Sequence, residues 1–258
     1  MKTNVTLTLI AIVLFSIAAQ SSVDQLQLCT IERTITPQAA TPAGEVLLEE
    51  SFEEQFPPAD WKVLSFGTSA QQWRPNDDIA RTGSYCALMS WVQEDGTTDE
   101  WLVTKAIDLS QVSGARLFFY ESETYWSYGL EHTIRVSTTS QDDPSAFEII
   151  DTMIPDNHII NGFGGAAVEL DLSKFVGNST VYVAFCYSTE VADLWYIDDI
   201  SVVVPPEHDV RANNLTLDDH VTGGKMGLVQ GSVENIGLNA ESFTVEFGYK
   251  DWDGSLVV

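Results

Sequence analysis

Two adjacent carboxylates lie in the middle of an otherwise apolar stretch of the chain. Asp198 and Asp199 interrupt residues 194–204, whose aromatic and β-branched side chains predict a β-strand. Neighbouring residues of a strand point to opposite faces, so we expect only one of the two acids to look toward the core. A carboxylate removed from water needs a cation, backbone donors or a water channel. We therefore expect a calcium ion here, at the edge of a β-sandwich.

Calcium takes six to eight oxygen ligands, so acids elsewhere in the chain must contribute. The candidates are Glu53 on the first predicted strand and Asp99 in the acidic loop 94–100, together with Asp198 or Asp199. The alternative is that these are ordinary solvated acids at strand ends.

A second candidate site is a short run of aromatic residues. Tyr125, Trp126 and Tyr128 fall in a loop between two predicted strands, whereas most other aromatic residues are expected in the core. Exposed rings on the rim of a sandwich could stack on a sugar or grip a protein partner. We expect this loop to bind a ligand.

Catalysis has little support in the sequence. The four histidines stand in unrelated places, and no Gly-x-Ser-x-Gly, His-Glu-x-x-His or phosphate-loop motif is present. A pair of acids beside a sugar cleft would be needed for a glycosidase, but a chain this acidic contains such pairs by chance. We expect no enzyme activity.

The charge of the chain limits its partners. It has 258 residues with 12 basic and 38 acidic side chains, a formal charge of −26. This excess argues against nucleic acid and anionic lipid, both of which are bound by Lys and Arg. It fits an exported protein that uses hard cations such as calcium.

The first residues are typical of a secretion signal. Met1 and Lys2 precede an apolar run over residues 7–17 that is short for a membrane span, and small residues follow. We expect a signal peptide over 1–21, a linker or propeptide over 22–44, and no membrane insertion of the mature chain. The predicted location is extracellular, with attachment to the cell surface as an option.

Three cysteines remain in an oxidising compartment. Cys86 and Cys186 lie in apolar strand-like runs, and Cys29 lies in the predicted propeptide. A Cys86–Cys186 disulfide and two buried free thiols are both compatible with the sequence.

Short apolar runs separated by turn residues predict an all-β fold without an amphipathic helix. We expect an antiparallel jelly-roll sandwich over 45–205, in which the first and last strands are neighbours. Residues 206–258 predict part of a second, immunoglobulin-like sandwich, because about four of the usual seven strands are present. The strands expected in the first unit are 45–53, 71–74, 84–91, 101–104, 115–122, 133–139, 147–150, 168–172, 180–187 and 194–204.

Several motifs of the first unit, taken in order, resemble one known family. They include Glu50-Ser51-Phe52-Glu53, Thr98-Asp99-Glu100-Trp101-Leu102-Val103-Thr104, Glu131-His132 and Tyr196-Ile197-Asp198-Asp199-Ile200. This part of the chain is similar to the cleaved-adhesin domains of gingipain haemagglutinin/adhesin regions, although Lys105 replaces the family's usual proline. Val233-Glu234-Asn235-Ile236-Gly237 resembles bacterial CARDB-type modules.

The resemblance implies a galactose-binding-like jelly roll with structural calcium that acts in adhesion. Its expected partners are a host or matrix protein or a cell-surface glycan. It also implies export by a type IX system. The alternative function is a carbohydrate-binding module of a larger secreted hydrolase or peptidase whose catalytic part is absent here.

Overall fold

The computed structural model divides the chain into two compact units, which are described separately. One comprises residues 39–205 and the other comprises residues 1–38 with 206–258. The residues that the structure describes are 7–13, 44–68, 70–90, 97–124, 131–153, 162–189, 194–217, 227–235, 237–239, 249–250 and 256–257.

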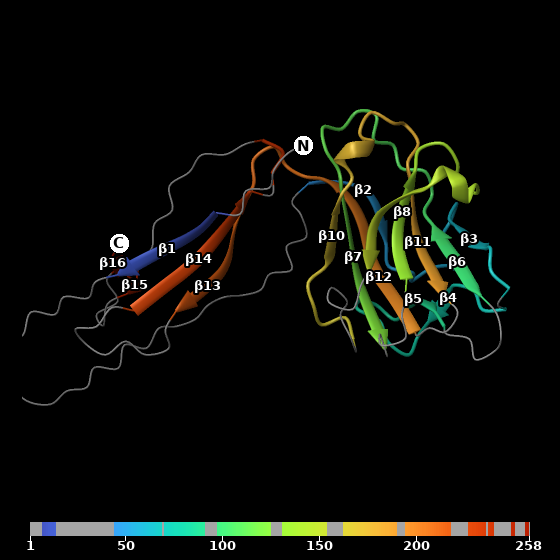
Figure 1. The fold of residues 1–258 in the computed structure, drawn as a ribbon, viewed down its shortest axis with the longest axis horizontal. Coiled ribbons are helices and arrows are strands. Elements are labelled where there is room, and N and C mark those ends of the chain that lie inside the picture. Colours follow the sequence, from blue (N-terminus) through green and yellow to red (C-terminus); the bar gives the residue numbers. More distant parts are fainter. Residues whose placement is uncertain are drawn as a thin grey trace, which may run out of the picture. The chain divides into compact units, whose positions relative to one another are not determined.

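Unit 39–205 is a sandwich of two antiparallel sheets (Figure 1). One sheet has the order β10-β7-β12-β5-β4, with β2 also paired to β12. Its strands are β2 (Glu45–Glu50), β4 (Arg74–Asn76), β5 (Cys86–Met89), β7 (Arg116–Thr124), β10 (Val168–Asp171) and β12 (Leu194–Val204). The other sheet has the order β3-β6-β11-β8-β9. Its strands are β3 (Lys62–Ser65), β6 (Thr98–Val103), β8 (Glu131–Ser137), β9 (Glu148–Met153) and β11 (Tyr182–Thr189).

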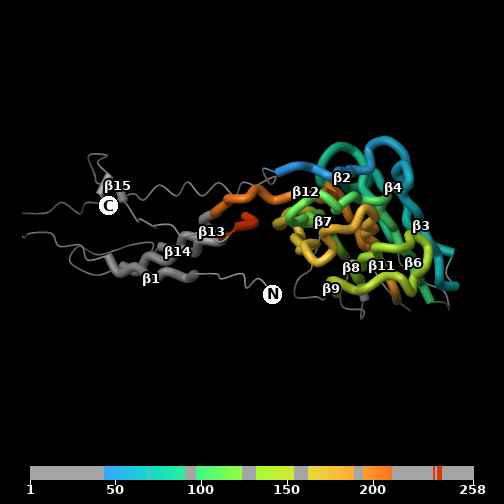
Figure 2. Tube along the Cα trace, turned by 90° about the horizontal axis from the view of Figure 1, so that it is seen from above, coloured from blue at the N-terminus to red at the C-terminus, as the bar shows by residue number. Residues whose placement is uncertain are grey.

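Strand β12 organises the six-stranded sheet. It pairs with β7 on one side, and on the other side with β5 at residues 195–197 and with β2 at residues 200–204. The first and last strands of the unit are therefore neighbours, as predicted, and Figure 2 shows β2 beside β12. The jelly-roll prediction is confirmed.

The core fills the space between the two sheets. Alternate residues of each strand point inward, so Leu117 and Phe119 of β7 meet Val183 and Phe185 of β11, all fully buried. Phe119 and Phe185 pack edge to face with ring centroids 5.1 Å apart. This alternation predicts most of the strands from the sequence alone.

Several segments differ from the prediction. The first strand, expected over 45–53, ends at Glu50 and leaves Glu53 outside it. Residues 62–65, expected in no element, form β3. The predicted acidic loop over 94–100 ends earlier, because Thr98–Glu100 already belong to β6. The strand expected at 71–74 begins only at Arg74, because Trp73 instead turns its indole into the core and donates a hydrogen bond to the Glu100 carbonyl oxygen.

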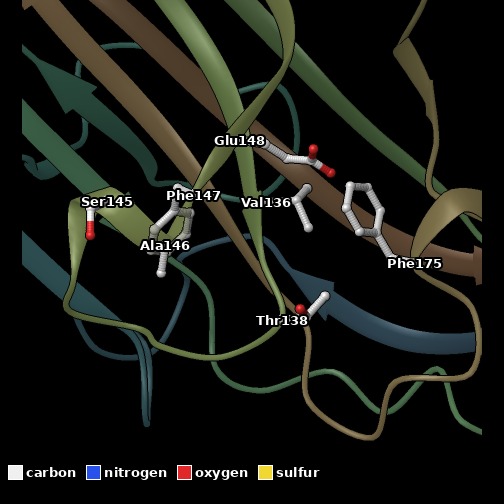
Figure 3. Close-up of a pocket in the computed structure, with 7 residues that line it drawn as sticks. All are labelled: Val136, Thr138, Ser145, Ala146, Phe147, Glu148 and Phe175. Carbon is white, nitrogen blue, oxygen red and sulfur yellow. The ribbon is translucent and has the colours of Figure 1, made fainter.

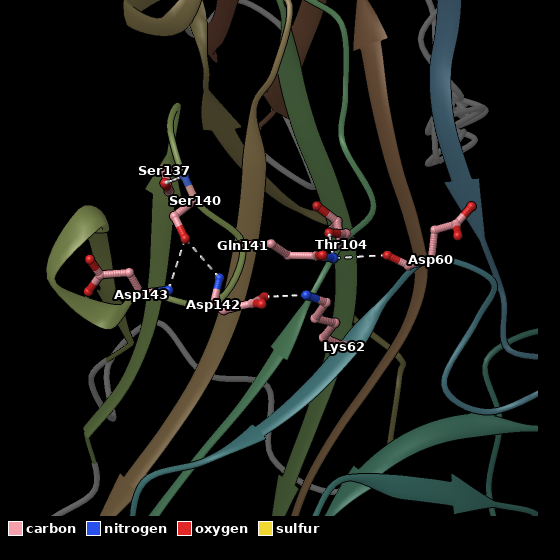
Figure 4. A network of polar contacts seen from close by, with 8 residues as sticks. All are labelled: Asp60, Lys62, Thr104, Ser137, Ser140, Gln141, Asp142 and Asp143. Atoms are coloured by element: carbon pink, nitrogen blue, oxygen red, sulfur yellow. Dashed lines mark hydrogen bonds and ion pairs between the residues drawn. The ribbon is translucent and has the colours of Figure 1, made fainter.

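Helical structure in the described residues is confined to short 3-10 turns, which include Pro144–Ala146 and Ser173–Phe175. The first of these lies in the connection between β8 and β9, which is tied to β3 (Figure 4). Gln141 Nε2 donates to the backbone oxygens of Asp60 and Thr104 at 2.8 and 2.9 Å, and Lys62 pairs with Asp142.

The smaller unit is also built of strands. β14 (Gly227–Asn235) pairs antiparallel with β13 (Val210–Leu217) and with β1 (Leu7–Val13), and β15 (Tyr249–Lys250) pairs with β16 (Leu256–Val257). Strand β1 lies inside the segment predicted as a signal peptide. Its removal by cleavage and the immunoglobulin-like character of residues 206–258 stay predictions. None of the helices that the structure describes has the length and apolarity needed to cross a bilayer.

Candidate functional site

The two adjacent carboxylates of β12 both engage one loop segment. Asp198 Oδ2 accepts hydrogen bonds from the backbone N–H groups of Arg81 and Thr82, at 2.8 and 3.4 Å. Asp199 Oδ2 pairs with Arg81 Nη1 at 2.8 Å, and Asp199 Oδ1 accepts from the Thr82 hydroxyl. These contacts hold residues 81–82 against β12.

A break in the regular strand brings both carboxylates to the same segment. Asp198 shares the side of β12 that carries Tyr196, away from the main core, and it is fully buried. Asp199 has φ +47°, and the pairing of β12 with β7 changes register between Asp198 and Ser201. Such a bulge redirects a side chain that strict alternation would send to the other face. The expectation that the two acids point to opposite faces of the strand is therefore wrong.

Glu53 binds the same loop a few residues later. Its Oε1 accepts from the backbone N–H groups of Ser84 and Tyr85 at 2.8 and 2.7 Å. Between them Gly83 has φ +62°, and a Cβ added there would lie 2.3 Å from the Glu53 carboxyl carbon. The positive φ favours glycine at this turn, and any larger side chain would have to displace the Glu53 carboxylate. Glu53, Asp198 and Asp199 thus converge on residues 81–85, which we call the clamped segment.

The electrostatics of this site are uneven. Burial raises the pKa of Asp198 to about 6, although the backbone donors at Arg81 and Asp199 act to lower it. The Arg81 guanidinium, besides pairing with Asp199, lies over the Tyr120 ring with Cζ 3.4 Å from the centroid. The charge of Asp199 is therefore balanced by the Arg81 guanidinium, whereas the hydrogen bonds given above for Asp198 come from backbone N–H groups.

Asp99, the fourth predicted ligand, lies elsewhere. It belongs to β6 in the other sheet, where its carboxylate accepts from Trp101 Nε1 at 2.7 Å. Within the described ranges, no three His, Cys, Asp or Glu side chains form a metal-binding group. The aromatic residues Tyr125, Trp126 and Tyr128 lie outside the described residues, so their role in ligand binding stays a prediction.

A second set of polar residues lies between the sheets at one end of the sandwich. In the five-stranded sheet, Tyr187 of β11 is directly paired with Glu100 of β6 and with His132 of β8. In the facing sheet, Trp195 of β12 is paired with Glu123 of β7. All five are buried, as is Glu121, one inward position along β7. We call Glu100, Glu121, Glu123 and His132 the polar layer.

Contacts within the polar layer are close. The His132 ring lies between Tyr187 and Trp195, with centroid distances of 4.8 and 4.4 Å. His132 Nε2 is 3.3 Å from Glu123 Oε1, and Trp195 Nε1 donates to Glu121 Oε2 at 2.8 Å. Burial raises the pKa of Glu100 to about 7, against the lowering effect of the Ser65 hydroxyl. Buried titratable groups of this kind are enriched at functional sites.

The polar layer was not predicted from the sequence, although the alternation of inward-facing residues along its strands indicates it. Glu121 and Glu123 continue the inward phase of Leu117 and Phe119, and Glu100 is in phase with Leu102. Likewise His132 is in phase with Ile134. When the inward-facing positions of a strand change from apolar to acidic residues toward its end, the pattern indicates that the interior is polar there.

The fold decides between a Cys86–Cys186 disulfide and two buried free thiols in favour of the thiols. Cys86 lies on the outer side of β5 and Cys186 on the outer side of β11, in the other sheet, and both thiols are free and buried. Burial raises the pKa of Cys86 to about 12 and raises that of Cys186 further.

We expect both thiols to be inert in the native protein, because the thiolate is the reactive form. In a Cys29→Ser variant, Ellman's reagent at pH 8 should report no thiol until guanidinium is added, and two afterwards. Prompt reaction of the native variant would contradict the burial of these side chains.

The structure also holds a surface groove of about 330 Å³ near the end of β8 (Figure 3). Its lining includes Val136, Thr138, Phe147, Glu148 and Phe175, none of which was predicted as a site residue. Glu148 pairs with Lys174 at 2.5 Å, and both side chains are largely exposed.

Comparisons with known proteins find similarity over the sandwich. The family model described as Cleaved Adhesin Domain matches residues 45–202. Among solved structures, the K1 cleaved adhesin domain of Lys-gingipain from Porphyromonas gingivalis W83 is 26% identical, with a TM-score of 0.46, covering 60% of this chain and 96% of that domain. The K3 domain of the same protein is 19% identical, with a TM-score of 0.47, covering 62% and 98%.

A xylan-binding CBM22-1 domain of Paenibacillus barcinonensis Xyn10C is also similar. It is 13% identical, with a TM-score of 0.41, covering 64% of this chain and 99% of that domain. No curated protein sequence matches the chain.

Proposed function

Because this chain belongs to the cleaved adhesin domain family, we propose that it is a secreted, calcium-stabilised and non-catalytic adhesion module at a bacterial cell surface. The observation that carries the proposal is the family match over the whole sandwich, residues 45–202. The convergence of Glu53 and Asp198 on the clamped segment supports the calcium part.

The donor set of the clamped segment fits calcium in part. Glu53 and Asp198 supply carboxylates, and Asp198 is buried without a cationic side chain of its own. Asp199 is held by Arg81, and Asp99 lies in the other sheet. Backbone carbonyl oxygens and water would complete a shell of six to eight oxygens. A bound calcium ion would supply the positive charge that the Asp198 carboxylate lacks.

Calcium is expected to raise the melting temperature of the full chain, and EDTA to remove the increase. A ligand that binds only the folded state stabilises it by about 2.7 kcal/mol at a hundredfold excess over its Kd. Near-UV circular dichroism should show the shift, and Glu53→Gln and Asp198→Asn should each reduce it.

Asp99→Asn is the matched control, because its amide oxygen can still accept from Trp101 Nε1. It should keep the full calcium response. The calcium proposal fails if the wild-type melt ignores calcium, or if all three variants respond equally.

The proposed partner is a host or matrix protein or a cell-surface glycan. Binding to immobilised matrix proteins without binding to a glycan panel would favour the adhesion module. Glycan binding alone would favour the alternative, a carbohydrate-binding module of a larger secreted hydrolase or peptidase. Turnover of peptide or glycoside substrates, abolished by one acid-to-amide change, would overturn the non-catalytic part.

A further inference from the structure

The acids that hold the clamped segment already face a cation, which is a side chain of the chain itself. Arg81 Nη1 lies 2.8 Å from Asp199 Oδ2. In the part of the chain that the structure describes, no other Lys or Arg forms an ion pair with Glu53, Asp198 or Asp199. The side chains of Arg81 and Asp199 are only 25% and 19% exposed. Water therefore screens this pair less than it screens a pair on the open surface.

Three contacts fix the position of Arg81. Besides the pair with Asp199, its Cζ atom lies 3.4 Å from the centroid of the Tyr120 ring, and Tyr120 of β7 is directly paired with Asp198 of β12. The backbone N–H of Arg81 donates to Asp198 Oδ2 at 2.8 Å. A guanidinium can stack on a ring and bind a carboxylate at once, because its donors lie in the plane of the group. The cation is thereby held beside both acids.

Asp199 departs from regular strand geometry where it meets this cation. Its φ of +47° lies in the left-handed region, which is unfavourable for a residue with a Cβ, and the register of β12 shifts at the same place. Both of its carboxylate oxygens are used, Oδ2 by Arg81 and Oδ1 by the Thr82 hydroxyl. Strained residues persist where their surroundings hold them, and they are frequent at binding sites. The strain at Asp199 points to a role for its contact with Arg81.

The pair with Arg81 limits what Asp199 can offer to a metal. A calcium site gains affinity with the number of carboxylates that reach the ion. With Arg81 in place, the carboxylates of Glu53 and Asp198 remain for a metal at the clamped segment, while that of Asp199 is engaged. A divalent cation beside Asp199 would also be repelled by the guanidinium. The guanidinium and a metal ion would therefore compete for Asp199.

We propose that Arg81 is a resident counter-cation of the clamped segment, which competes with calcium for Asp199 and so sets the affinity of this site for the metal. The proposal rests on the calcium part of the proposed function and names the residue that controls it. In the metal-free protein the guanidinium balances Asp199 and keeps residues 81–82 bound to β12. When the guanidinium is removed, a third carboxylate becomes free to bind the ion.

A purely structural ion pair would behave in the opposite way. Its loss would loosen residues 81–82 and weaken any metal bound beside them. Under competition, loss of the guanidinium frees a carboxylate and strengthens metal binding. The direction of the change in calcium affinity therefore separates the two roles.

The test is a calorimetric titration of the full chain with calcium chloride at pH 8 in a buffer without chelator. Arg81→Gln should bind calcium at least about tenfold tighter than the wild type does, because one more carboxylate can reach the metal. Unchanged or weaker binding in Arg81→Gln would overturn the proposal.

Arg74→Gln is the matched control for net charge. Arg74 lies on β4 of the same sheet, is exposed, and donates to the Ser90 hydroxyl at 3.1 Å. Its replacement removes the same charge without a contact to Asp199, so this variant should bind calcium as the wild type does. An equal gain in both variants would show that only the net charge matters, and would also refute the role of Arg81.

A second substitution identifies the carboxylate. In the Arg81→Gln background, Asp199→Asn should abolish the gain in affinity, since the two residues act as a coupled pair. Asp99→Asn in the same background should keep the gain, because Asp99 lies in the other sheet. A gain that survives Asp199→Asn would rule out competition for this carboxylate.

The Arg81→Gln variant remains informative if it does not fold without metal. Calcium should then restore the near-UV circular dichroism spectrum of the wild type, because the ion replaces the missing cation. Failure of calcium to restore the spectrum would contradict the proposal.

The titration separates this proposal from the calcium part of the proposed function. Binding by Arg81→Gln but not by the wild type would support the role of Arg81 and refute calcium stabilisation of the native protein. Equal binding by both would refute only the role of Arg81. Absence of binding in both would refute both proposals.

Discussion

Trp195→Ala is expected to lower the free energy of unfolding by about 3–5 kcal/mol, the range for truncating a buried tryptophan. The Trp195 indole has no exposed surface, stacks on His132 and lies 5.3 Å from the Trp73 ring. The change also removes the N–H donor of the buried Glu121 carboxylate. Guanidinium denaturation followed by near-UV circular dichroism measures the loss.

Two further variants separate packing from hydrogen bonding. Trp195→Phe keeps an aromatic ring but not the donor, so it should cost about 1–3 kcal/mol, mainly through Glu121. Ile149→Ala on β9, where the side chain is 55% exposed, should change stability by less than about 0.5 kcal/mol. A Trp195→Ala effect as small as that of Ile149→Ala would contradict the central place of this indole.

The second large effect is a dependence of stability on pH. Burial raises the pKa of Glu100 from 4.5 in the unfolded chain to about 7 in the folded protein. The unfolded state therefore loses this proton first. The contribution of protonated Glu100 to the free energy of unfolding is fully present below about pH 4.5. It is lost as the pH rises through about 7, and the loss is at most about 3 kcal/mol.

Denaturation in EDTA at pH values from 4 to 8.5 should show this decline, and Glu100→Gln should flatten it. The pKa values of Asp198 and Glu50 are also raised, chiefly by burial, and these groups act in the same direction, so part of the slope should remain in the variant. An unchanged slope in Glu100→Gln would show that Glu100 does not hold its proton as proposed.

The sequence predicted those features that depend on local pattern. The apolar run at 194–204 is strand β12 with the predicted bounds, and the placement of the first strand beside the last is also correct. Alternation of apolar and polar residues is a local property, so it survives in the fold.

Features that depend on long-range register were missed. Nothing local indicates that residues 81–85 cross β12, or that a bulge at Asp199 directs two consecutive carboxylates to one segment. Asp99 joined the predicted calcium ligands because it is acidic and near a strand, and only the sheet order separates it from Asp198. Similarly, Glu100 and His132 lie close together because β6 and β8 flank β11 and both residues pair with Tyr187, a register that the sequence does not indicate.

The pairing of β2 with β12 brings the two ends of the sandwich together. Glu45 pairs with Val204 and Val46 with Val203, so the chain enters and leaves the sandwich at adjacent points. A domain with adjacent ends can be inserted into a loop of a host protein, or copied in series, with little disturbance to the flanking chain. The sandwich is thus suited to act as a transferable cassette in longer polypeptides.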